Sequence, residues 1–273
     1  MAKTDNPTTE MIVAPPPTET ALVTLDYGAD AAAGYEHQTK DDTTIPFLVL
    51  LQSNSPSVAS GDRGARAGCW RNTVTEEVWD RETGVLFVPA TTRHVYTEWV
   101  PRDEGGGFRG QHEVDAPTVL AALSQAATRL GKIPTGEGTE LVETFYVYGV
   151  ICGDGGHAES MAVLSFTSMK IRAYKTWMTR LRQFVLHTPT GLVRPPLYAH
   201  HARLGSAAGK NDKGSFYIPS ISSADPRGLR ESLLAPSDER FVMAKACREM
   251  VDAGAAKIDV AQAAASTDDG IPF

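Results

Sequence analysis

The pattern of apolar and polar positions predicts a chain built mainly from β-strands. The run IPFLVLLQ at 45–52 is apolar almost throughout and begins the folded part. After it, segments rich in valine, threonine and aromatic residues alternate with turns rich in glycine, serine and asparagine, which is typical of strands. The predicted strands are 70–79, 84–100, 141–151, 157–166, 197–204 and 215–221.

Apolar residues that recur every three or four positions predict helices between these strands. The clearest helix covers 168–187, where Thr167 or Ser168 can cap the start and Trp177 joins the apolar stripe. We therefore expect Trp177 to lie in the core. An alanine-rich helix is predicted at 116–130 and a last helix at 237–253.

The order of these elements indicates a fold class. A strand at 84–100, a hairpin, the helix 168–187 and two further strands follow the order of a five-stranded Greek-key barrel. We expect a mainly β fold with α, which is an OB-fold-like five-stranded barrel with helical insertions and disordered termini. Other α+β folds can use the same elements in the same order.

Composition divides the chain into three parts. Residues 1–44 contain Pro15, Pro16 and Pro17 and an excess of acids, so we expect a disordered acidic arm. Residues 45–253 would form the OB-like domain with insertions. The alanine-rich, polar residues 254–273 would form a flexible tail that ends in a short partner-binding tip.

Charge is segregated along the chain, although the formal net charge is −7. Residues 160–211 contain no aspartate or glutamate. A long basic block in an acidic protein usually contacts a polyanion, and a merely solvated basic face is the alternative. The cations of this block are Lys170, Arg172, Lys175, Arg180, Arg182, Arg194, Arg203 and Lys210.

Several classes of protein are disfavoured by the sequence. No apolar run approaches the roughly 18 residues of a membrane span, and the first residues lack a signal core, so we expect a cytoplasmic protein without membrane contact. No motif of a P-loop, hydrolase, metalloprotease or dinucleotide site is present, so we expect neither an enzyme nor a cofactor or metal. The distant cysteines Cys69, Cys152 and Cys247 favour no disulfide, and His200 and His201 are interpreted as ordinary polar positions.

Binding of single strands needs cations for the phosphates and aromatic rings on which bases stack. Alternation in 141–151 places Leu141, Phe145, Val147 and Ile151 on one face and Tyr146 and Tyr148 on the other. The two tyrosines either contact DNA or pack under the helix 116–130. Cations and one aromatic residue of nearby loops and of the helix 168–187 complete the predicted DNA-binding set. This set is Arg102, Phe108, Arg109, Tyr146, Tyr148, Lys170, Arg172, Lys175, Lys210 and Lys213.

The last six residues, DDGIPF, closely resemble the tip of bacterial single-stranded DNA-binding proteins (SSB), with Gly270 where that family has a third aspartate. In that family the tip docks onto helicases, nucleases and recombination mediators. The resemblance implies that Phe273 and its carboxylate enter a partner's pocket, where Pro272 presets the backbone. The implied partner-binding residues are Asp268, Asp269, Ile271, Pro272 and Phe273.

The segments IPFLVLLQSNSP, NTVT and SFTSMKIRAYKTW resemble phage-encoded proteins. Some phage SSBs are similar to bacterial SSB only in having an OB-type core and an acidic tail that ends in phenylalanine. Together these features predict a phage protein of the host cytoplasm that binds single-stranded DNA without strong sequence preference, in replication, recombination or repair. An annealing or recombination mediator, a replication enzyme with an unrecognised site and a virion or adaptor protein are the alternatives. The sequence leaves the oligomeric state open.

Overall fold

The computed structural model describes residues 33–37, 42–126, 131–153, 157–211, 214–261 and 264. The chain divides into two compact units, Met1–Gln38 and Thr39–Phe273. Every described helix and strand belongs to the second unit, and the following account concerns that unit alone. Its fold is mainly β with α, which confirms the predicted class.

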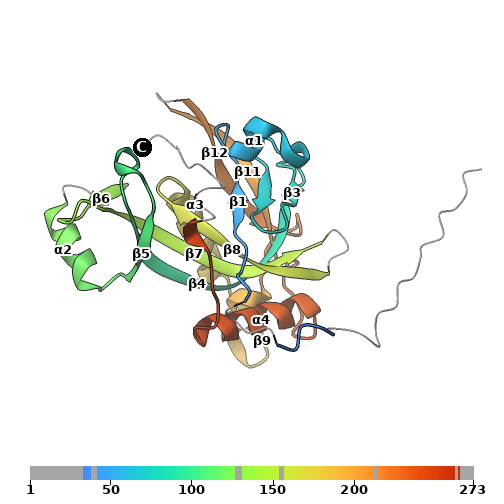
Figure 1. The fold of residues 1–273 in the computed structure, drawn as a ribbon. Coiled ribbons are helices and arrows are strands. Elements are labelled where there is room, and N and C mark those ends of the chain that lie inside the picture. The colour runs from blue at the N-terminus through green and yellow to red at the C-terminus, as the bar shows by residue number, and fades with distance from the viewer. Residues whose placement is uncertain are drawn as a thin grey trace, which may run out of the picture. The chain divides into compact units, whose positions relative to one another are not determined.

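One large antiparallel sheet forms the centre of the second unit (Figure 1). Its two long strands, β4 (Val85–Trp99) and β7 (Glu140–Cys152), pair along most of their length. The neighbours run in the order β8–β7–β4–β11–β12, and β5 and β6 extend the far ends of β4 and β7. The remaining bounds are β5 Phe108–Glu113, β6 Lys132–Pro134, β8 Ala158–Thr167, β11 Ala202–Asn211 and β12 Gly214–Ser223.

The predicted five-stranded barrel is wrong in one respect, because the sheet does not close on itself within the described residues. The segment 45–52, which contains β1 (Leu48–Leu50), contacts both β8 and β12. On one side, the Val163 N–H donates to the Pro46 carbonyl over 2.9 Å. On the other side, the Gln52 amide accepts from the Tyr217 N–H over 2.9 Å and donates to the Tyr217 carbonyl over 3.0 Å.

This bridging position explains why the segment 45–52 is apolar without alternation. Phe47, Val49 and Leu51 belong to one buried cluster, whereas Leu48 and Leu50 belong to the other. A strand with both faces buried has no polar face to present, so its sequence reads as a continuous apolar run. The hydrophobic free energy of both clusters therefore holds this segment in place.

The helices cover the two faces of the sheet. Helix α4 (Glu239–Asp252) packs on β4, β7 and β8, and its cap Asp238 accepts from the Arg240 N–H over 2.9 Å (Figure 1). Helix α3 (Lys170–Gln183) packs on the other face, where Trp177 is 2% exposed, so the core prediction for this ring is confirmed. Helix α2 (Pro117–Gln125) covers a smaller cluster with Tyr96. In the part of the chain that the structure describes, no helix is long and apolar enough to cross a membrane.

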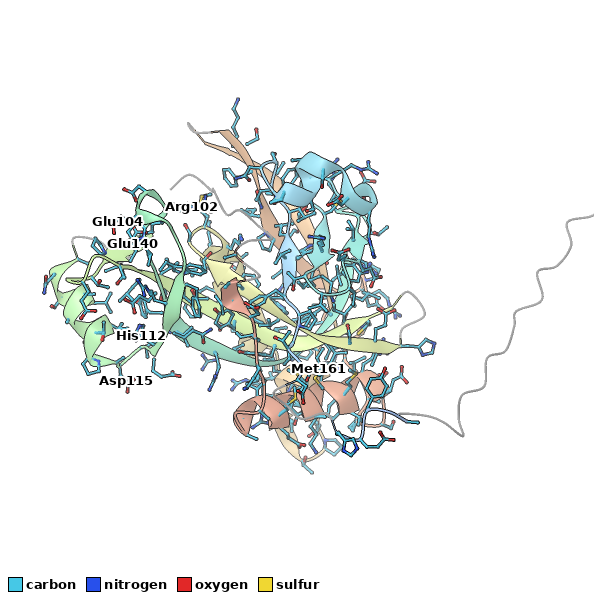
Figure 2. All side chains as sticks on the ribbon, viewed as in Figure 1. Arg102, Glu104, His112, Asp115, Glu140 and Met161 are labelled. Carbon is cyan, nitrogen blue, oxygen red and sulfur yellow. The ribbon has the colours of Figure 1, made fainter. Side chains whose placement is uncertain are left out.

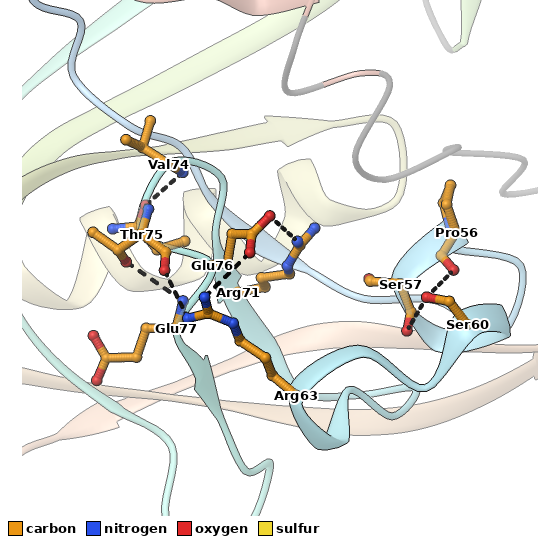
Figure 3. A network of polar contacts seen from close by, with 10 residues as sticks. Pro56, Ser57, Ser60, Arg63, Arg71, Val74, Thr75, Glu76 and Glu77 are labelled. Atoms are coloured by element: carbon orange, nitrogen blue, oxygen red, sulfur yellow. Dashed lines mark hydrogen bonds and ion pairs between the residues drawn. The ribbon is translucent and has the colours of Figure 1, made fainter.

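A small second sheet joins β1 to the hairpin of β2 (Trp70–Asn72) and β3 (Val78–Trp79), beside the short helices α1 (Pro56–Ser60) and η2 (Asp62–Gly64). The hairpin turn is tied to η2 by charge (Figure 3). Glu76 pairs with Arg71 over 3.2 Å and with Arg63 over 3.4 Å. The Asn72 side chain accepts from two N–H groups of the same turn, which explains why a polar residue is buried there.

Several predicted boundaries need correction. Residues 108–113, expected in a loop, form β5, and the predicted strand 197–204 begins instead with a 3₁₀ turn, η4 (Leu197–Ala199). The helix predicted to His187 ends at Gln183, and a short hairpin of β9 (Leu186–Thr188) and β10 (Gly191–Val193) follows. Residues 154–156, between β7 and β8, lie outside the described residues, as do 127–130.

The ends of the folded core lie side by side. The Ile45 N–H donates to the Lys257 carbonyl over 2.8 Å, and Ile45 and Ile258 form a parallel bridge. Val260 is buried in the same cluster as Phe47. The acidic arm and the flexible tail stay predictions, since most of residues 1–41 and nearly all of 262–273 lie outside the described part.

Candidate nucleic-acid interface

A pocket of about 380 Å³ opens at the end of the sheet where β4 turns into β5. We call it the β4–β5 pocket. Its floor comes from the ends of β4, β7 and β8, and its walls come from the loop 105–107, from residues 47–50 and from the start of α3. Pockets that hold small organic groups span about 300–1,000 Å³, so this one is large enough for such a group.

Two aromatic rings, Trp99 and Phe108, stand in the wall of this pocket. Their centroids lie 5.3 Å apart with a 60° interplanar angle, which is an edge-to-face contact. The Trp99 indole N–H donates to Thr97 Oγ1 over 3.0 Å, and Thr97 Oγ1 lies 3.0 Å from Thr144 Oγ1. This hydrogen-bonded chain fixes the indole, so the ring surface is arranged before any ligand arrives.

Three consecutive glycines form the loop that brings β5 back beside β4. Gly105, Gly106 and Gly107 have φ values of +106°, +68° and +127°, which only glycine adopts without strain. The Val100 N–H donates to the Gly107 carbonyl over 2.9 Å and closes the loop. Because Gly106 and Gly107 line the pocket without side chains, a ligand can approach their backbone closely.

The pocket is electropositive. Arg102, Lys132 and Lys170 are among the described residues that line it, and Glu140 is the single carboxylate in that set. Lys132 Nζ lies 2.7 Å from Glu140 Oε2, so this lysine forms an ion pair with the carboxylate. Arg102 and Glu140 lie at the same end of the molecule (Figure 2).

The start of α3 adds to this positive potential. Lys170 is the first residue of the helix and is buried, and the first turn of the helix contains no acidic residue. Unpaired N–H groups give a helix N-terminus a partial positive charge, which favours anions such as phosphate. Thr167, just before the helix, also lines the pocket.

A charged brace behind the pocket holds β5 against β4. The Glu98 carboxylate accepts from the Thr139 hydroxyl and lies 2.7 Å from His112 Nε2. These two hydrogen bonds, with the Thr139 bond the larger cause, lower the pKa of Glu98. Glu98 therefore stays ionised at neutral pH, and its contacts link β4, β5 and the turn before β7.

Comparison with protein families identifies the family of this chain. The model described as Pam3 phage gp34-like protein matches residues 17–257 of this chain. The chain belongs to this family. The chain is thus a phage protein, as the sequence predicted, and the family name states no activity. Comparisons with curated proteins and with solved structures gave no match.

Four of the predicted DNA-binding residues converge on the β4–β5 pocket, although they are far apart in the sequence. These are Arg102, Phe108, Tyr146 and Lys170. The others lie elsewhere. Arg109 is exposed on β5, Lys210 is exposed near the end of β11, Arg172 lines a second hollow between α3 and β12, and Lys175 lies near the ring of Phe145.

The prediction that Tyr146 and Tyr148 lie exposed on the sheet is wrong, because their side chains are 1% and 2% exposed. The alternative cover, the helix 116–130, is also wrong. Residues of α4 and of the segment 45–51 cover this face instead, and Phe47 contacts the Tyr146 ring edge-to-face at 6.0 Å. Burial raises the pKa of both phenols. Tyr146 lines the floor of the pocket. Because its ring is not exposed, a base cannot stack on it.

The structure also shows where the three cysteines and the adjacent histidines lie. Cys69, Cys152 and Cys247 are buried free thiols. His200 and His201, interpreted as ordinary polar positions, are instead buried, at 3% and 8% exposure. Lys213 and the tip residues Asp268, Asp269, Ile271, Pro272 and Phe273 lie outside the described residues, so their roles stay predictions.

Trp99 and Lys132 line the pocket as well, although neither was among the predicted DNA-binding residues. Trp99 is the last residue of a correctly predicted strand, and its alternation with Thr97 placed both on one face. Nothing local indicated that β5 would bring Phe108 beside it. Lys132 lies in a glycine-rich stretch that reads as a turn, and its position depends on the pairing of β6 with β7.

Proposed function

We propose that this protein binds single-stranded DNA in the β4–β5 pocket. One observation carries the proposal: aromatic rings and cations that lie far apart in the sequence converge on one pocket of suitable size. Unpaired bases would stack against Phe108 and Trp99, while Arg102, Lys132 and Lys170 contact phosphates. A duplex keeps its bases stacked inside, so we expect a preference for unpaired strands without strong sequence specificity.

The phage family sets the context of this activity. We propose that the protein acts in the cytoplasm of the bacterial host, in replication, recombination or repair of phage DNA. Each of these processes exposes single strands that need a binding protein. No catalytic step is part of this proposal.

Salt dependence tests the phosphate contacts. With about three cations on phosphates, log K should fall with log salt with a slope of about −2, since each contact on a single strand contributes roughly −0.7. Fluorescence anisotropy of a labelled oligonucleotide at several salt concentrations measures the slope. Tight binding that does not change with salt would contradict these contacts, and equal affinity for duplex DNA would contradict the preference for single strands.

We also propose that the last six residues recruit replication or recombination proteins of the host. Support comes from the sequence of the tip, DDGIPF, and from the position of Val260, Ala261 and Ala264, which line the β4–β5 pocket. A tail that leaves the core there would hold a recruited protein close to bound DNA.

Removal of residues 268–273 tests this role. A purified host protein that binds the bacterial SSB tip should bind the full-length chain and lose at least tenfold in affinity for the truncated chain, since Phe273 is the expected anchor. Phe273→Ala should have the same effect, with DNA affinity unchanged in both variants. Loss of DNA binding on truncation would contradict a purely recruiting tip.

A further inference from the structure

Three aromatic rings stack on the face of the sheet opposite the β4–β5 pocket. His94 of β4 and Phe145 of β7 are cross-strand neighbours, and their rings lie 4.0 Å apart with a 12° interplanar angle. Phe145 also stacks with Tyr174 of α3 at 4.6 Å and 27°. Side chains alternate between faces along a strand, so Thr144 reaches the pocket and Phe145 points away from it.

The accessible ring of this stack is His94, which lies between the two helices on that face, whereas Phe145 is buried beneath it. Phe145 belongs to the cluster under α3, whereas Tyr96, two residues after His94, belongs to the cluster under α2. Neither cluster includes His94, and its side chain is 38% exposed. The ring is nevertheless held in place, because His94 Nε2 lies 3.0 Å from Glu143 Oε1.

The helix beside the stack is strongly cationic. Helix α3 contains five cations and no acidic residue along Lys170–Gln183. Lys175 Nζ lies 5.4 Å from the centroid of the Phe145 ring, within the range of a cation–π contact. Arg182 is close enough to Tyr174 to act on its phenol electrostatically. Glu143, which is bonded to His94, is the acidic group that faces the stack from β7.

We propose that this second surface, made by His94, Phe145, Tyr174 and Lys175, is an additional contact for single-stranded DNA. An unpaired base would stack on the exposed imidazole of His94, while Lys175 and Arg182 contact the adjacent phosphates. The charges of Lys175 and Arg182 favour a polyanion rather than an apolar peptide as the occupant, and the flat ring favours a planar group. This inference rests on the proposed function and extends it to a second face of the sheet.

Substitution of His94 tests the second surface. For an oligonucleotide of about 30 nucleotides, which is longer than one OB-type site covers, His94→Ala should weaken Kd about tenfold, because one stacked base is lost. His94→Phe keeps a flat ring over Phe145 and should retain most of the affinity. His157→Ala is the matched control, since His157 also pairs with a glutamate, Glu239, at a different position on the surface.

The outcomes separate this inference from the proposed function. If His94→Ala binds with the affinity of the wild-type protein while Phe108→Ala binds more weakly, the second surface alone is overturned. Absence of any binding by the unchanged protein overturns the proposed function instead. An equal loss in His157→Ala also overturns the second surface, because the effect would then not depend on this stack. Thermal melting of each variant checks that the fold is retained.

Discussion

Replacement of Phe108 by alanine should weaken binding of single-stranded DNA roughly 5- to 150-fold. The ring stands in the wall of the β4–β5 pocket, beside Trp99, and removal of a stacking platform costs about 1–3 kcal/mol per base. Phe108 is half-buried on an outer strand, so we expect a much smaller effect on folding than on binding. Anisotropy titrations of a labelled oligonucleotide at low salt measure the change.

Two comparisons make this prediction specific. Arg102→Ala should also weaken binding and should make the salt slope less steep by about 0.7, because one phosphate contact is lost. Arg248→Ala removes an exposed cation of α4 that pairs with Asp252, far from the pocket lining, and should leave Kd unchanged. A Phe108→Ala protein that melts normally and binds with unchanged affinity would contradict the pocket as the DNA site.

The folded protein should lose stability as the pH falls from 6.5 toward 4, which begins above the pH at which most carboxyl groups titrate. Burial lowers the pKa of both His200 and His201 from 6.5 to about 4, with Arg240 a further cause at His201. Among the described residues, His200 Nδ1 and His201 Nε2 have no hydrogen-bond partner. Both rings therefore stay neutral in the fold, whereas the unfolded chain binds a proton at each ring once the pH falls below 6.5.

The direction of the pH dependence of stability follows from this difference in bound protons. The contribution of the two neutral histidines to the free energy of unfolding is fully present above pH 6.5 and is lost as the pH falls toward 4. Each histidine lowers the free energy of unfolding by about 1.4 kcal/mol per pH unit, and the two together lower it by about 2.7 kcal/mol per pH unit. Urea unfolding at pH 7, 6 and 5 measures this slope. The double variant His200→Gln, His201→Gln should reduce it strongly, although its stability at pH 7 will be lower. A slope that is the same in both proteins would show that other groups cause the pH dependence.

Local patterns predicted the long strands well. The run of β-branched and aromatic residues at 84–100 became β4 within one residue at each end, and 141–151 became β7. In both segments, side-chain preference and burial favour the same extended conformation. The helix 168–187 was also found, and it ends early because Phe184 is extended and leads into β9.

Features that depend on distant parts of the chain were not predictable in the same way. Alternation correctly separated Tyr146 from Phe145, but it cannot indicate that α4, about a hundred residues later, covers the tyrosine face. The sequence of β5, FRGQHE, lacks β-branched residues, and it becomes a strand through pairing with β4. Closure of the sheet was mispredicted for the same reason, since the segment 45–52 occupies the position between β8 and β12.

The candidate site contains residues that local patterns identified and an arrangement that depends on distant parts of the chain. Arg102, Phe108 and Lys170 were identified by residue type and by the absence of nearby acids, and these properties are local. Their convergence on one pocket depends on the glycine loop 105–107, the Glu98 brace and the start of α3. Trp99 and Lys132 completed the site only when β5 and β6 were placed against the long strands.

Photo-crosslinking tests the central claim most directly. A single-stranded oligonucleotide with photoreactive bases is irradiated with the full-length protein at low salt, and the attached peptides are mapped by mass spectrometry. The account predicts crosslinks to Trp99 and Phe108 that a matching duplex does not give. An absence of crosslinks at low salt, or crosslinks confined to positions away from the β4–β5 pocket, would contradict it.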